Sequence, residues 1–145
     1  MMKFGTFSVV VGNEACNARC DFCVAKMTEQ LGLKCGEINR RVFDIACRLA
    51  DKADVTTALL TGKGEPTLFP DQISDYLVGL EQHIFPLIEL QTNGLVFLKD
   101  KTKTSGYKTK WVSQLTYWRG LGLTTVALSI VDYTNPMNQL IYCND

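Results

Sequence analysis

The sequence of this 145-residue chain predicts an α/β fold built on a parallel β-sheet. Four short stretches of β-branched and aliphatic residues alternate with three stretches whose apolar residues recur at helical spacing. Strands that alternate with helices favour a parallel sheet joined by right-handed crossovers. The length suits one domain with a buried core, so we expect residues 1–145 to form a single domain.

The four expected strands each end at residues that indicate a turn or loop. The first strand runs into Gly12, and the second runs into a glycine-rich turn that begins at Gly62. The third ends at Thr-Asn-Gly, and the fourth ends near Ser129. The expected strands are residues 6–11, 55–61, 87–91 and 125–130.

Three helices are expected between these strands. Residues 40–53 follow Asn39, a residue type that often caps a helix N-terminus. A second helix is expected to begin near Pro70, and a third is expected to end at Gly120. The polar, basic residues 98–110 are expected to form a solvated loop. Aromatic side chains of these helices are expected to pack in the core, namely Phe43, Tyr76, Trp111 and Trp118.

A loop with three cysteines, Cys16, Cys20 and Cys23, follows the first expected strand. Thiolates select zinc, copper(I) or iron–sulfur clusters, and a compact loop can direct three of them to one centre. The spacing favours a [4Fe–4S] cluster with one iron open to a small ligand. A structural zinc site needs a fourth ligand. The alternative is therefore a zinc-binding structural or interaction module completed by Cys35.

Composition limits the partners and the cellular compartment that we expect for this chain. The formal net charge is zero, which gives no overall attraction to nucleic acid or to an anionic membrane. No stretch approaches the ~20 apolar residues of a membrane-spanning helix, and the first residues do not resemble a signal peptide. Half of the six cysteines lie in one loop, which fits a reducing compartment. We therefore expect a cytoplasmic protein without a membrane partner.

The pattern Cys-x3-Cys-x2-Cys, with the aromatic Phe22 before the last cysteine, resembles the cluster loop of the radical S-adenosylmethionine (radical SAM) superfamily. The resemblance implies an enzyme in which Cys16, Cys20 and Cys23 hold a [4Fe–4S] cluster and the open iron binds S-adenosylmethionine. It also implies a reductant such as flavodoxin or ferredoxin. Reductive cleavage of the cofactor then gives a 5′-deoxyadenosyl radical that abstracts hydrogen from a substrate.

The turn Gly62-Lys63-Gly64-Glu65-Pro66 resembles the Gly-Gly-Glu motif of the same superfamily. The resemblance implies that Gly62, Gly64 and Glu65 approach the amino group of S-adenosylmethionine. Glycines let a backbone come close to a ligand, and a carboxylate suits an ammonium group. Lys63 is an insertion relative to the commonest form of the motif. Its ammonium group is expected either to be solvated or to contact a substrate anion. A plain turn after a strand is the alternative.

Three further positions match weaker features of the superfamily. Asn93 lies in a Thr-Asn-Gly strand end, and Ser129 matches a serine that contacts the ribose hydroxyls. Phe22 would lie against the adenine. All these residues lie at strand ends or follow them, and the carboxyl ends of parallel strands share one edge of the sheet. We therefore expect the cofactor-binding residues to lie close to the cysteine loop.

The resemblance extends over residues 9–129 and covers part of the superfamily's core. That core has six strands, whereas this sequence supplies about four. We therefore expect a partial (β/α) barrel that corresponds to the amino-terminal part of a radical SAM core. An exposed last strand is normally paired or covered. The chain is accordingly expected to be a truncated product or to complete its barrel with another polypeptide, such as a second copy. No residue pattern in the sequence identifies the substrate.

Overall fold

A computed structural model describes residues 5–28, 38–98, 106–132 and 134–143. Its centre is a four-stranded sheet in the order β1-β2-β3-β4, and all three neighbouring pairs are parallel. The α/β class and the parallel sheet are thus confirmed. The strands are β1 (Thr6–Val10), β2 (Thr57–Thr61), β3 (Leu87–Thr92) and β4 (Thr125–Leu128).

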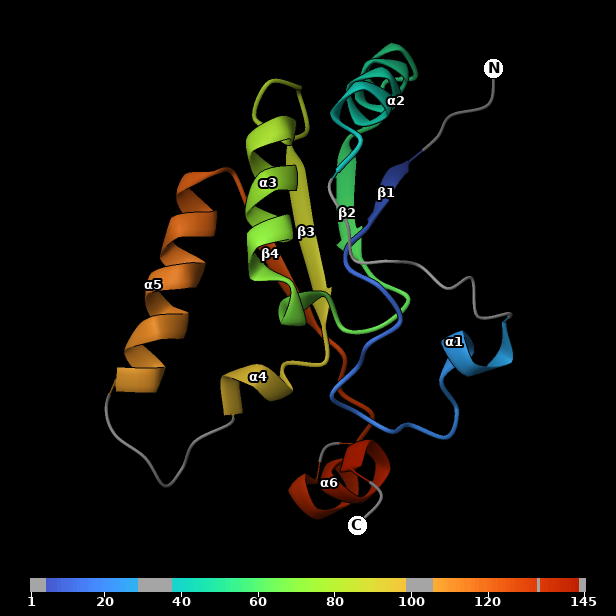
Figure 1. Ribbon diagram of the computed structural model, residues 1–145, viewed down its shortest axis with the longest axis vertical. Helices are drawn as coiled ribbons and strands as arrows, with labels where there is room; N and C mark the ends of the chain where they lie inside the picture. The colour runs from blue at the N-terminus through green and yellow to red at the C-terminus, as the bar shows by residue number, and fades with distance from the viewer. Residues whose placement is uncertain (1–4, 29–37, 99–105, 133, 144–145) are drawn as a thin grey trace.

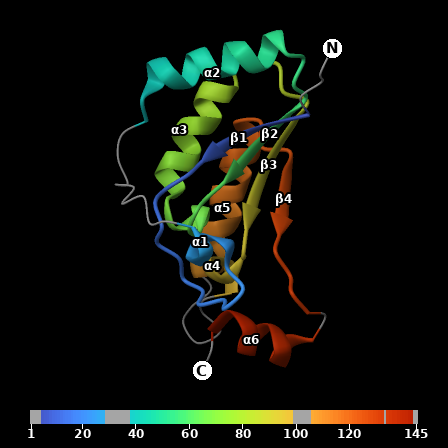
Figure 2. The ribbon, with the colours of Figure 1, turned by 90° about the vertical axis from the view of Figure 1, so that its right-hand side faces the viewer.

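Consecutive strands are joined by three long helices, α2 (Arg40–Lys52), α3 (Pro70–Leu80) and α5 (Gly106–Gly120). Asn39 caps α2 as expected, because its side chain accepts a hydrogen bond from the Val42 N–H. Figures 1 and 2 show α3 and α5 on one face of the sheet and α2 near the end where the strands begin.

The core lies between the sheet and these helices. The strand register aligns Val9, Leu60, Leu90 and Val126 across the sheet, and the first three are buried. Alternate residues of a strand point to opposite faces, so one apolar row from each strand reaches the helices. The helices contribute buried apolar side chains to the same core, namely Cys47, Ala50, Ile73, Leu77, Leu80 and Trp118.

Four shorter elements lie near the ends to which the strands point. They are α1 (Val24–Met27), the 3₁₀ helix η1 (Pro66–Leu68), α4 (Leu95–Leu98) and α6 (Asn135–Cys143). In Figure 2, α6 lies below the ends to which the strands point. The same edge of the sheet therefore carries the cysteine loop and these four elements.

The prediction of a loop at residues 98–110 was wrong. Helix α5 begins at Gly106, so residues 106–110 are helical and not a loop, and residues 99–105 lie outside the described ranges. On α2, Val42 and Leu49 are exposed, because the helix turns its Cys47 and Ala50 side toward the core. The four aromatic residues expected in the core do pack there.

Candidate functional site

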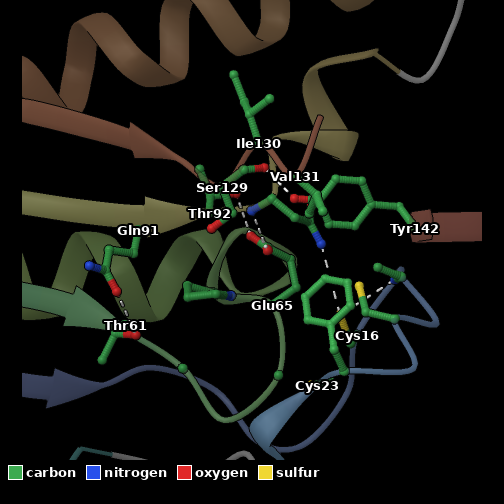
Figure 3. Close-up of a pocket in the computed structure, with 17 residues that line it drawn as sticks. Cys16, Cys23, Thr61, Glu65, Gln91, Thr92, Ser129, Ile130, Val131 and Tyr142 are labelled. Atoms are coloured by element: carbon green, nitrogen blue, oxygen red, sulfur yellow. Dashed lines mark hydrogen bonds between the residues drawn. The ribbon is translucent and has the colours of Figure 1, made fainter. Parts of the chain in front are cut away.

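One pocket of about 280 Å³ lies at the carboxyl edge of the sheet (Figure 3). Its walls come from the cysteine loop, from the loops after β2, β3 and β4, and from α6. Its volume is similar to that of the smaller ligand pockets in proteins, about 300 Å³. All the predicted site residues line it, namely Cys16, Cys20, Phe22, Cys23, Gly62, Gly64, Glu65, Asn93 and Ser129.

The Glu65 carboxylate links the loops that follow β2 and β3. It is only 3% exposed. Its Oε1 accepts hydrogen bonds from the backbone and hydroxyl of Thr67 and from the Thr92 hydroxyl, the last at 2.6 Å. Its Oε2 accepts the Asn93 backbone N–H at 2.9 Å. A buried carboxylate requires such donors, so this side chain fixes the positions of both loops.

The glycine-rich turn packs directly on the start of the cysteine loop. The Gly64 N–H donates to the Asn13 carbonyl at 3.1 Å, and the Glu65 N–H donates to the Ala15 carbonyl at 2.9 Å. A Cβ atom at Gly64 would lie 2.0 Å from the Ala15 carbonyl oxygen. Position 64 therefore needs glycine because two backbone segments meet there, independently of any ligand.

Asn93 is held in one orientation by its own neighbours. Its Oδ1 accepts the Leu95 N–H at 3.0 Å, which leaves the Nδ2 group to act as the donor. That group lies 2.8 Å from the Asn17 Oδ1 and 3.8 Å from the Cys16 Sγ. The end of β3 is thereby connected to the cysteine loop.

The three thiols of the cysteine loop differ in exposure. Cys16 is exposed, whereas Cys20 and Cys23 are partly buried. Partial desolvation by the surrounding loops raises the pKa of the Cys16 and Cys20 thiols. The loop is held by a turn in which the Cys23 N–H donates to the Cys20 carbonyl at 3.3 Å.

The donor set can be compared with the requirements of a metal centre. Within the described ranges, no three His, Cys, Asp or Glu side chains are grouped closely enough to hold one metal ion. Thiolates of a [4Fe–4S] cluster bind different irons, so their sulfurs need not converge on one point. Three thiols lining one pocket therefore fit a cluster. Cys35, the fourth ligand of the zinc alternative, lies outside the described residues.

A buried donor in the cysteine loop supports the same fit. The Nδ2 atom of Asn17 is buried and has no hydrogen-bond partner in the described part of the chain. Leaving a buried donor unpaired costs about 1–3 kcal/mol. Asn17 is next to Cys16, and the sulfur atoms of a bound cluster are acceptors that would relieve this cost.

Residues that the sequence interpretation missed also line the pocket. They are Ala18, Thr61, Pro66, Gln91, Thr92, Ile130, Val131 and Tyr142. Tyr142 is buried on α6, and its hydroxyl donates to the Ser129 carbonyl. Its carbonyl accepts the Arg19 N–H at 2.7 Å. Pro136, the second residue of this helix, is a usable signal for its start, since proline is accepted in the first turn of a helix.

Lys63 does not line this pocket. Its ammonium group lies 2.7 Å from a Glu14 carboxylate oxygen, and both side chains are largely buried. It borders a neighbouring hollow on the side of the turn that faces α1. The insertion in the motif therefore forms an ion pair with the segment before Cys16.

A scan against models of protein families finds no match to this sequence. A search of curated proteins likewise finds no match. No helix in the described part of the chain is long and apolar enough to cross a membrane.

Proposed function

We propose that this chain is a radical SAM enzyme in which Cys16, Cys20 and Cys23 hold a [4Fe–4S] cluster. The main support is that these thiols share one pocket with Glu65 and Ser129, which come from separate loops. With S-adenosylmethionine bound, one electron from a reductant such as flavodoxin or ferredoxin would break a sulfonium carbon–sulfur bond, giving methionine and a 5′-deoxyadenosyl radical that abstracts hydrogen from the substrate. The substrate is not identified by these residues.

The roles of the other residues follow from their contacts. Oε1 of Glu65 receives three donors from the chain, whereas Oε2 receives one, from Asn93. A carboxylate oxygen can accept more than one hydrogen bond, so Oε2 is the atom available to the amino group of S-adenosylmethionine. Phe22 is 52% exposed and lines the pocket, which leaves its ring free to contact the adenine.

The arrangement of the strands agrees with this role. Ligands of parallel α/β proteins bind beyond the carboxyl ends of the strands. The pocket lies at that edge, and β1 to β4 would correspond to the first four strands of the radical SAM core. The protein would contribute the positioning of the cluster, cofactor and substrate, while the cofactor supplies the radical chemistry.

The proposal is tested by measuring cofactor cleavage. Protein reconstituted anaerobically with iron and sulfide is reduced with dithionite and incubated with S-adenosylmethionine, and chromatography measures 5′-deoxyadenosine. We expect slow release without a substrate, and none from Cys20→Ala. A cluster that forms but neither cleaves the cofactor nor changes its spectrum in its presence would contradict the proposal and favour an electron-transfer role.

A further inference from the structure

The side chain of Asn93 has two donor hydrogens, and both have partners in the cysteine loop. The Nδ2 atom lies 2.8 Å from the Asn17 Oδ1 and 3.8 Å from the Cys16 Sγ. Sulfur is a large, weak acceptor, so its hydrogen bonds are longer than those of oxygen. The amide therefore directs a partial positive charge at one thiol of the loop.

This orientation is fixed from the opposite side of the residue. The Leu95 N–H occupies the Asn93 Oδ1, and the Glu65 carboxylate accepts the Asn93 backbone N–H at 2.9 Å. Glu65 is buried and is held in turn by Thr67 and Thr92. Few degrees of freedom remain at position 93, so the donor is already aligned before any ligand binds.

We propose that Asn93 is a positioning residue for the cluster, whose amide donates to the Cys16 sulfur and raises the reduction potential of the centre. This role rests on the proposed function and differs from the cofactor contact expected from the sequence. A reduced cluster carries one more negative charge than an oxidised one. A hydrogen-bond donor on a ligand sulfur therefore stabilises the reduced form more, and such bonds are known to set iron–sulfur potentials.

The same geometry predicts which changes remove the effect. In Asn93→Ser the shorter side chain can still accept from the Leu95 N–H, as serine does in turns, but it cannot reach Cys16. Asn93→Asp keeps the size and the acceptor and loses the donor. A matched control is Asn13→Ser, because Asn13 makes the same kind of turn, to the Ala15 N–H at 2.8 Å, at the start of this loop.

The test is a potentiometric titration of the reconstituted cluster followed by electron paramagnetic resonance. We expect Asn93→Ser to make reduction about tenfold less favourable, equal to about 59 mV for one electron, with a larger shift for Asn93→Asp and little change for Asn13→Ser. Iron content is measured in every variant to show that the cluster is intact.

Two results would overturn this role, and they can be told apart. If the clusters of Asn93→Ser and Asn93→Asp assemble and keep the wild-type potential, or if Asn13→Ser shifts equally, Asn93 does not tune the centre. If the wild-type protein assembles no cluster, the proposed function fails and the role of Asn93 fails with it. If no cluster assembles in Asn93→Ser, the reduction potential of Asn93→Asp is compared with that of the wild type.

Discussion

The Glu65 carboxylate accepts the backbone N–H of Asn93 at 2.9 Å, which joins the loop after β2 to the loop after β3. Figure 3 shows the Glu65 side chain beside Thr92 in the pocket. Because Glu65 also accepts hydrogen bonds from the Thr67 and Thr92 hydroxyls, it stabilises the edge of the sheet. In the proposed function it would also offer an oxygen to the cofactor. A glutamate with both functions gives mutants with two separable effects.

Replacement of Glu65 by alanine should therefore destabilise the protein as well as weaken binding of S-adenosylmethionine. The substitution leaves buried donors of Thr67, Thr92 and Asn93 without an acceptor, which we expect to lower the free energy of unfolding by at least about 2 kcal/mol. Urea denaturation measures this loss. The exposed Glu81→Ala should change stability by less than about 0.5 kcal/mol. Equal stability of both variants would contradict the bridging role.

A methyl group at Gly64 should disrupt the contact between the glycine-rich turn and the cysteine loop. The added Cβ would meet the Ala15 backbone, which cannot move without shifting Cys16. We expect Gly64→Ala to lose at least about 2 kcal/mol of stability and to bind less iron on reconstitution. Gly120→Ala is the matched control, since a Cβ there meets nothing within 4 Å. Similar iron content and stability in the two variants would rule out this explanation.

The buried thiol of Cys47 makes stability depend on pH in the alkaline range. Burial, with smaller contributions from the charges of Asp51 and Asp44, raises its pKa from 9.0 to about 11. The folded state then holds this proton more tightly than the unfolded state does. The stability that the protonated Cys47 thiol contributes is fully present below about pH 9 and is lost as the pH rises through about 11. We expect the free energy of unfolding to fall by about 1–3 kcal/mol over this window.

The measurement compares urea unfolding at pH 8 and pH 10.5 for the wild type and Cys47→Ala. Cys47→Ala should lose less stability between the two pH values than the wild type does. Tyr76, whose pKa is also raised by burial, contributes in the same direction and remains in both proteins. Identical pH slopes would show that Cys47 is not the titrating group.

Loss of the Tyr142 hydroxyl should loosen α6 from the pocket. Tyr142→Phe removes the donor to the Ser129 carbonyl while keeping the ring, which we expect to cost about 1 kcal/mol. Hydrogen exchange should become faster in residues 135–143 and stay unchanged in β2 and β3. The exposed Tyr117→Phe serves as the control. Unchanged exchange in α6 would mean that this hydrogen bond does not hold the helix.

The strands and the location of the pocket could be predicted because local patterns determine them. Alternating strand and helix signals imply a parallel sheet, and turn residues such as Gly62 and Asn93 mark its carboxyl edge. Contacts between distant residues could not be predicted in this way. The Lys63–Glu14 ion pair joins residues far apart in the sequence, and no local pattern indicates it.

The contacts of His83 likewise could not be predicted from local sequence patterns. The sequence places this residue shortly after the helix that is expected to begin near Pro70, and its side chain is only 9% exposed in the structure. Its Nδ1 lies 2.6 Å from an Asp51 carboxylate oxygen on α2, and its Nε2 lies 3.8 Å from an Asp44 oxygen. The packing of α2 beside the end of α3 brings these residues together, and that packing depends on the whole fold.

The most direct test of the central claim is the electron paramagnetic resonance spectrum of the reduced, reconstituted protein with and without S-adenosylmethionine. We predict a cluster signal that is lost in Cys20→Ala and that changes when S-adenosylmethionine is added. An iron assay of the same sample should give about four irons per chain. Tight binding of one zinc ion per chain with no cluster would contradict the claim and support the zinc-binding alternative.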